Sequence, residues 1–105
     1  MKVNLITPGH SPRIGRHWNY EVHATRDGKP VAGKITAQLV DPAGTVQPVR
    51  FGNTPKNVLN WPFKGEFRDF IVWPPDALGV TFKLRLTVHA GADETVVSYA
   101  VTPGD

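Results

Sequence analysis

The chain has 105 residues, of which 40% are hydrophobic and 20% are charged, and it contains ten glycines, ten prolines and no cysteine. This composition is typical of one globular domain with many short strands and turns, and it excludes a disordered chain. The missing cysteines exclude disulfides, thiolate nucleophiles and cysteine-ligated metal sites. No apolar run approaches the ~20 residues of a membrane-spanning helix. We therefore expect one domain over residues 1–105 without a membrane span, with frayed ends at residues 1–2 and 102–105.

The net charge of +3 is spread unevenly along the chain. Basic against acidic residues number six to two in residues 1–34, three to one in 35–65 and three to six in 66–105. A nucleic-acid-binding domain usually gathers its basic residues into one patch. Here the basic residues stand singly, so we expect no nucleic-acid partner.

In the first half of the chain, alternating apolar and polar residues predict strands separated by turns that contain Gly or Pro. These strands are predicted at residues 3–7, 17–25, 34–40 and, more weakly, 45–51. The pair Asp27-Gly28 is typical of a tight hairpin turn. Pro48 cannot donate a backbone hydrogen bond, so it favours an edge position for the strand at 45–51.

In the second half, the alternation is strongest at residues 80–90. Further strands are predicted at 66–73 and 94–101, while 58–63 is ambiguous because Pro62 limits regular pairing. Asp69 interrupts an apolar strand face, which predicts a buried carboxylate paired with an arginine or with backbone donors. Residues 73–79 begin with prolines and predict a turn with a short helical segment.

Seven or eight strands at intervals of ~8–12 residues, without a helical apolar stripe, are typical of an all-β sandwich or barrel. One polar face per strand favours antiparallel sheets. Uneven strand lengths and a long connection at residues 52–65, which can cross between sheets, favour the sandwich. We therefore predict an antiparallel, immunoglobulin-like β-sandwich with Greek-key connections. Trp18 is expected at the centre of its core, together with Trp73.

Two runs, residues 15–22 (GRHWNYEV) and 27–33 (DGKPVAG), resemble exported bacterial immunoglobulin-like domains of the YtkA-like and CopC-like kind. Residues 65–70 (GEFRDF), followed by Trp73-Pro74, are similar to a later strand of these domains. The resemblance covers residues 10–101. It implies an exported module, periplasmic, on the cell surface or secreted, that is often one part of a larger envelope protein. The copper-binding members use an N-terminal histidine, whereas this chain begins with Met1. The resemblance therefore does not predict copper binding for this chain.

The first twelve residues hold one lysine and a short apolar patch, which is not the pattern of a secretory signal peptide. Two interpretations follow. The chain is either a mature or excised exported domain with an added Met1, or a cytoplasmic protein.

A metal site needs two or three imidazoles or carboxylates that converge on one ion. The chain has four histidines, His10, His17, His23 and His89. His17 and His23 face the same way, but six residues of extended chain hold them ~20 Å apart. His10 can fold back towards His17, so these two are the candidate ligands of a metal carrier. The prediction we favour is solvated or locally bonded histidines, with no bound metal and no other cofactor.

Catalytic motifs are missing from the sequence. It contains no G-x-S-x-G, no Gly-rich phosphate loop and no H-E-x-x-H. Glu66 and Asp69 are three residues apart on a predicted strand and therefore point to opposite faces. We expect that the protein is not an enzyme.

The candidate binding surface consists of Asn57, Asn60, Trp61 and Phe63, in a segment rich in Pro, Gly and Asn. If exposed, the two aromatic side chains can stack on sugar rings or anchor a protein partner; otherwise they cap the end of the sandwich. The leading hypothesis is a non-catalytic structural or interaction module whose partner is a protein or an adjacent domain. The alternatives are a carbohydrate-binding module and a carrier of copper or another metal. The sequence leaves the oligomeric state open.

Overall fold

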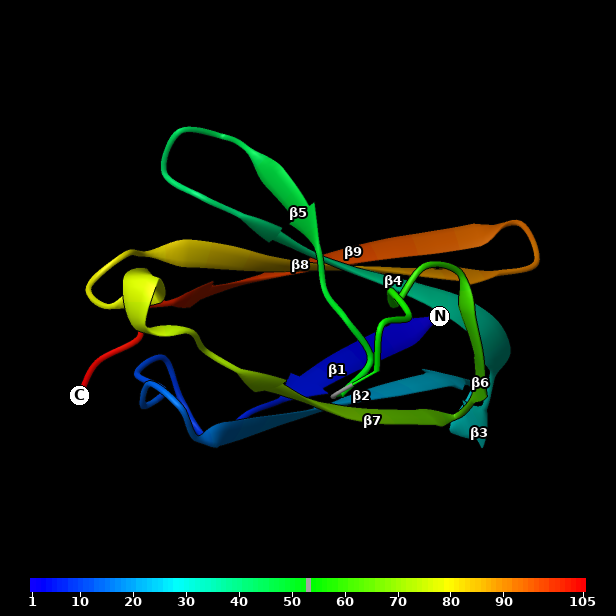
Figure 1. The fold of residues 1–105 in the computed structure, drawn as a ribbon. Coiled ribbons are helices and arrows are strands. Elements are labelled where there is room, and N and C mark those ends of the chain that lie inside the picture. The colour runs from blue at the N-terminus through cyan, green and yellow to red at the C-terminus, as the bar shows by residue number, and fades with distance from the viewer. Residues whose placement is uncertain (53) are drawn as a thin grey trace.

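The structure, a computed structural model, describes residues 1–52 and 54–105 and consists almost entirely of antiparallel strands (Figure 1). The strands are β1 (Lys2–Ile6), β2 (His17–Arg26), β3 (Lys29–Pro30), β4 (Ala32–Val40), β5 (Val46–Pro48), β6 (Trp61–Lys64), β7 (Glu66–Val72), β8 (Phe82–Ala90) and β9 (Asp93–Val101). A single-turn 3-10 helix, η1 (Pro75–Ala77), follows β7, as the prolines in this segment predict.

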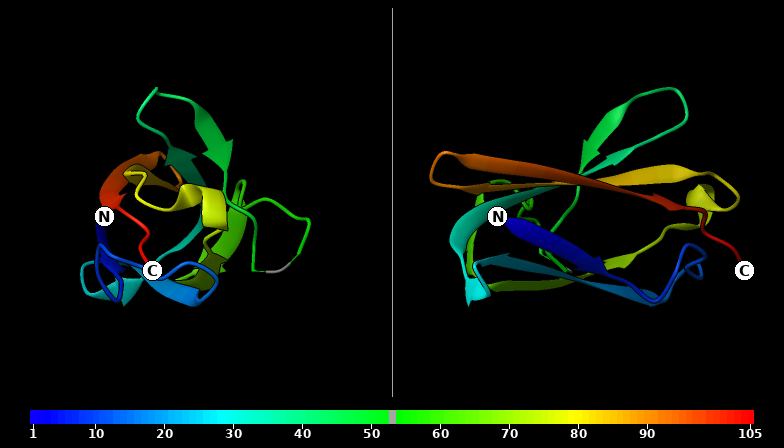
Figure 2. Two further views of the ribbon diagram at one scale, coloured as in Figure 1. Left: turned by 60° about the vertical axis from the view of Figure 1, so that its left-hand side comes forward. Right: turned by 180° about the vertical axis from the view of Figure 1, so that it is seen from behind.

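The strands form two sheets, of four and five strands, packed face to face (Figure 2). The first sheet has the order β1-β2-β7, with β3 paired to the end of β2, and the second has the order β6-β4-β8-β9, with β5 paired to β4. The two sheets are joined at one corner, where β6 pairs with β7 at Lys64 and Glu66. The chain crosses between the sheets after β3, after β6 and after β7. This is the predicted antiparallel sandwich with the Greek-key strand order of immunoglobulin-like domains.

Two turns illustrate how local sequence shapes the fold. Asp27 and Gly28 have φ values of +53° and +76°, the left-handed pair that a two-residue hairpin turn between β2 and β3 requires. Gly65 joins β6 to β7 with φ +72°. A Cβ atom at Gly65 would lie 2.8 Å from the Pro30 Cβ, so this position needs glycine for space as well as for conformation.

The core between the sheets is formed by alternate residues of β2, β4, β7 and β8. The fully buried set includes Tyr20, Val22, Ile35, Leu84, Leu86 and Val88. Trp18 and Trp73 are both buried, and their rings meet edge to face with centroids 6.0 Å apart. The prediction that these tryptophans supply central core mass is confirmed.

The segment between β4 and β6 differs from its predicted course. The strand expected at 45–51 is shortened to β5, which in the described part of the chain pairs with β4 alone, in agreement with an edge position. Beyond Pro48, the chain forms a small hairpin in which the Val58 N–H donates to the Val49 carbonyl oxygen at 2.7 Å. The side chains of both valines are buried next to β4. Figure 2 (left) shows the two arms of this hairpin, residues 49–52 and 54–58, in green beside the two layers.

Both chain ends differ from the frayed tails that we expect from the sequence. Lys2 pairs with Thr25 as the first residue of β1. At the other end Pro103 is buried, and Gly104 exchanges backbone hydrogen bonds with residues 12–14. These contacts anchor the C-terminal segment although its sequence reads as a turn. Among the described residues, no helix has the length and apolar character to cross a membrane.

Candidate functional site

The two aromatic residues of the predicted binding surface pack against the sandwich. Trp61 pairs with Ile35 in the sheet, and its ring stacks on Phe51 with centroids 4.3 Å apart. Phe63 is half-buried and meets the ring of Phe67 edge-on, with centroids 6.4 Å apart. Because Phe51 covers one face of Trp61, only the other face of the indole is left for a sugar ring.

The two asparagines of the predicted surface are exposed but occupy structural positions. Asn57 forms an isolated bridge with Arg50 within the hairpin of residues 49–58. Asn60 has φ +48°, and its N–H donates to the Thr36 Oγ1 at 3.0 Å. Asparagine tolerates the left-handed conformation better than most residues, so Asn60 serves the turn that leads into β6.

Asp69 is the buried charged residue of the core, with 8% of its surface exposed. Its Oδ2 accepts a hydrogen bond from the Tyr20 hydroxyl at 2.8 Å, and its Oδ1 accepts one from the Gly52 N–H at 2.8 Å. The sequence therefore predicts its burial and its backbone donor correctly, while the side-chain partner is a tyrosine rather than an arginine. Because Gly52 belongs to the hairpin of residues 49–58, Asp69 fastens this hairpin to the opposite sheet.

Burial raises the pKa values of both members of this pair. Desolvation raises the pKa of Asp69 above its usual value, and the hydrogen bonds from Tyr20 and from backbone N–H groups reduce that rise. Burial, and secondly the negative charge of Asp69, raises the pKa of the Tyr20 hydroxyl. Tyr20 therefore stays protonated and remains a donor at neutral pH.

The raised pKa of Asp69 predicts a pH-dependent stability. A group whose pKa is higher in the folded state stabilises the fold below its unfolded-state pKa, and this contribution is lost as the pH rises through the folded-state pKa. Asp69→Asn keeps a neutral hydrogen-bonding group and has no such titration. We expect the stability of wild type relative to Asp69→Asn to fall as the pH rises above about 4, measured by urea unfolding at a series of pH values. A constant difference between the two proteins would contradict the raised pKa.

The two histidines predicted as metal ligands have separate aromatic partners. His10 is exposed, stacks on Tyr99 with ring centroids 4.1 Å apart, and its Nδ1–H donates to the Ala100 carbonyl oxygen at 2.6 Å. His17 stacks on Phe70 with centroids 4.0 Å apart. These contacts occupy one face of each imidazole and place the two histidines against different sheets.

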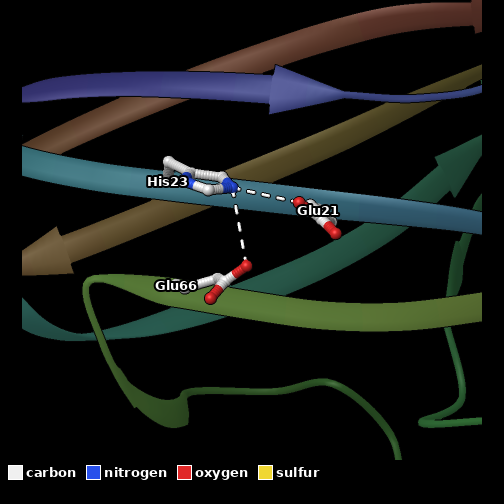
Figure 3. Close-up of side chains that lie close together, drawn as sticks. All are labelled: Glu21, His23 and Glu66. Carbon is white, nitrogen blue, oxygen red and sulfur yellow. Dashed lines mark hydrogen bonds and ion pairs between the residues drawn. The ribbon is translucent and has the colours of Figure 1, made fainter.

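A different cluster of metal-ligating residues lies on the outer face of β2 and β7 (Figure 3). Among the residues that the structure describes, Glu21, His23 and Glu66 are the one group of three or more His, Asp or Glu side chains whose ligand atoms all lie within 4.8 Å of one another. The His23 Nε2 is 3.1 Å from the Glu21 Oε2 and 3.7 Å from the Glu66 Oε1. Glu21 and His23 are half-buried, and Glu66 is more exposed.

Arg68 lies beside this cluster and contacts both of its carboxylates. Its Nε lies 2.6 Å from the Glu66 Oε1 and 3.2 Å from the Glu21 Oε1. The hydrogen bond to Glu66, together with the negative charges of Glu21 and Glu66, raises the pKa of the Arg68 guanidinium above its usual value. The two carboxylates thus already hold one cation between them.

The sequence alone does not indicate this cluster, because its members come from separate strands. The spacing of Glu21 and His23, two apart on a predicted strand, does indicate that they share a face. Glu66 joins them only through the pairing of β2 with β7, which sets His23 opposite Glu66 and Glu21 opposite Arg68. No spacing rule within one strand indicates which residue of a distant strand will stand opposite.

Comparisons with protein-family models, with curated proteins and with solved structures found no match to this chain. The geometry of the chain itself is therefore the basis for assigning a function.

Proposed function

We propose that this protein is a non-catalytic structural and interaction module of an exported bacterial protein, and that it joins a second copy of itself edge to edge through β9. The exported location is supported by the resemblance of residues 10–101 to envelope domains. The interaction is supported by one observation, the unpaired backbone edge of β9.

The hydrogen bonds at the C-terminal end of β9 show which of its backbone N–H and C=O groups point outward. The Ala100 carbonyl oxygen accepts from the His10 imidazole, and the Thr102 N–H donates to the His10 carbonyl oxygen. In a strand, backbone groups point to the same side at every second residue. The N–H and C=O groups of Glu94, Val96 and Ser98 therefore point away from β8, and in the described part of the chain β9 pairs with β8 alone.

The chain itself already uses part of this edge. The extended segment around His10 and Pro12 lies along residues 100–104 and takes up their outward backbone groups. A second strand that continues along the same edge towards Glu94 would meet a similar row of backbone C=O acceptors and N–H donors. Strand addition of this kind is a common mode of protein recognition.

Beyond the charged pair Asp93-Glu94 with which it begins, β9 lacks the protection that other edges of this sandwich carry. Proline stands in the short edge strands β3 and β5, as Pro30 and Pro48, and lysine begins β1 as Lys2. Such residues discourage pairing with another chain. Residues 95–101 (TVVSYAV) contain neither proline nor charge, and Val96 is 53% exposed on the outer face.

A second copy fits this edge by symmetry. An antiparallel pair of β9 strands about a two-fold axis at Val96 sets Val96 against its own copy and Glu94 against Ser98. No like charges stand opposite each other in this register, and an apolar contact forms at the axis. The interface is isologous, as two-fold interfaces of homodimers are.

Sedimentation velocity over a range of protein concentrations tests this function. We expect wild type to shift from monomer to dimer as its concentration rises, and Val96→Lys to remain monomeric because lysine disfavours edge pairing. Thr87→Lys places the same charge on the same face but on the interior strand β8, opposite Val96, and should still dimerise. A wild-type protein that stays monomeric, or equal loss in both variants, would overturn the proposed edge contact.

A further inference from the structure

We propose that Glu21, His23 and Glu66 form a binding site for a divalent transition metal ion, with Zn²⁺ as the best fit. The site lies on the outer face of the sheet β1-β2-β7, away from the edge of β9 in the other sheet. It adds a ligand to the protein and does not depend on whether two copies pair.

Strand geometry brings the three ligands together. Glu21 and His23 are two residues apart in β2 and therefore point to the same face. Glu66 stands directly opposite His23 in β7. Side chains at opposite positions of an antiparallel pair have Cβ atoms only about 4.5–5.5 Å apart, so this register places a carboxylate beside the imidazole.

The distances agree with coordination of one ion. Zinc binds imidazole nitrogen and carboxylate oxygen at about 2.0–2.2 Å in a tetrahedral arrangement, which sets neighbouring ligand atoms about 3.4 Å apart. The two separations from the His23 Nε2, 3.1 Å to Glu21 and 3.7 Å to Glu66, lie on either side of this value. Small rotations of the two carboxylates are enough to converge all three atoms, and water can take the fourth position.

The ion pairs of Arg68 show that the two carboxylates of the site share one cation. Its Nε bridges one oxygen of Glu21 and one of Glu66, so both carboxylates are already directed at a shared positive group. The side chain of Arg68 is 69% exposed and can turn into solvent. Exposed ion pairs contribute little to stability, so a metal ion that displaces Arg68 has a weak competitor.

The donor set selects the class of metal. One imidazole and two carboxylates suit Zn²⁺ and its neighbours Co²⁺, Ni²⁺ and Cu²⁺. Ca²⁺ and Mg²⁺ prefer sites built from oxygen ligands alone. The site contains no thiolate or thioether, the soft ligands that favour Cu⁺.

Isothermal titration calorimetry of the whole chain with ZnCl₂, in a buffer that does not bind zinc, tests the site. We expect one saturable equivalent for wild type and a loss of affinity of about tenfold or more for His23→Ala and for Glu66→Gln. His89→Ala is the matched control, because His89 is likewise on the outer face of a strand and stands opposite a glutamate, Glu94, in β8–β9. This variant should bind as wild type does.

Arg68→Ala separates a metal site from a simple network of ion pairs. Removing the competing guanidinium should tighten zinc binding several-fold if the ion takes its place, while circular dichroism confirms that each variant is folded. Wild type and Arg68→Ala without saturable binding, or a His89→Ala loss equal to that of His23→Ala, would overturn the proposal. Zinc binding and dimerisation through β9 are measured independently, so one proposal can fail while the other holds.

Discussion

Replacing Trp18 with alanine is expected to lower the free energy of unfolding by ~3–5 kcal/mol. The side chain is 3% exposed, and its ring lies among those of Tyr20, Trp73 and Tyr99, with centroids 6.0–6.3 Å away. Its indole N–H also donates to the Gly9 carbonyl oxygen at 3.0 Å, which ties the loop after β1 to the core. Alanine would leave a cavity between the sheets and an unpaired carbonyl, and both effects favour unfolding.

Urea unfolding followed by circular dichroism measures this loss. Trp61→Ala is the internal comparison, because Trp61 is only half-buried and stacks on one aromatic neighbour. We expect a clearly smaller loss for Trp61→Ala than for Trp18→Ala. A Trp18→Ala protein that unfolds at the same urea concentration as wild type would refute the central place of Trp18 in the core.

Replacing Asp69 with alanine is expected to cost about 2–6 kcal/mol, since it leaves two donors without partners and each costs about 1–3 kcal/mol. One is the buried hydroxyl of Tyr20 and the other is the backbone N–H of Gly52. Loss of the second bond should also release the hairpin of residues 49–58 from β7, because Asp69 is its polar link to that sheet.

Limited trypsin digestion reports on this release. Lys56 is exposed within the hairpin, and cleavage after it requires local opening of the chain. We expect faster cleavage at Lys56 in Asp69→Ala than in wild type. Asp69→Asn, which retains a hydrogen-bonding group of the same shape, should cleave close to the wild-type rate. Equal cleavage of wild type and Asp69→Ala would show that the carboxylate does not hold the hairpin.

Local patterns predict the elements of this fold well, because alternation and turn chemistry act over a few residues. The strands around Trp18 and Leu84 follow from apolar residues at every second position, and the turn at Asp27-Gly28 follows from the conformational freedom of these residues. The edge position of Pro48 follows from its missing N–H. Burial of Asp69 likewise follows from its place on an apolar strand face.

The candidate sites were less predictable because they depend on contacts between distant residues. Trp61 is an aromatic residue in a polar segment, which suggests exposure, but the chain folds Phe51 over one side of its ring. His10 and His17 lie close in sequence, yet each stacks on an aromatic residue of a different strand. Pro103, in a segment that reads as a tail, is buried because loop residues 12–14 pair beside it.

The sequence by itself therefore determined the all-β class, most of the strands, the inward faces and the buried carboxylate, since each depends on the period-2 geometry of an extended chain. Only the tertiary structure decided which residues meet across strands: Tyr20 and Gly52 at Asp69, Phe51 on Trp61, and Glu66 beside His23. The physical reason is register. Alternation specifies which face a side chain occupies, but the strand opposite it and the alignment with that strand are set by packing of the whole core.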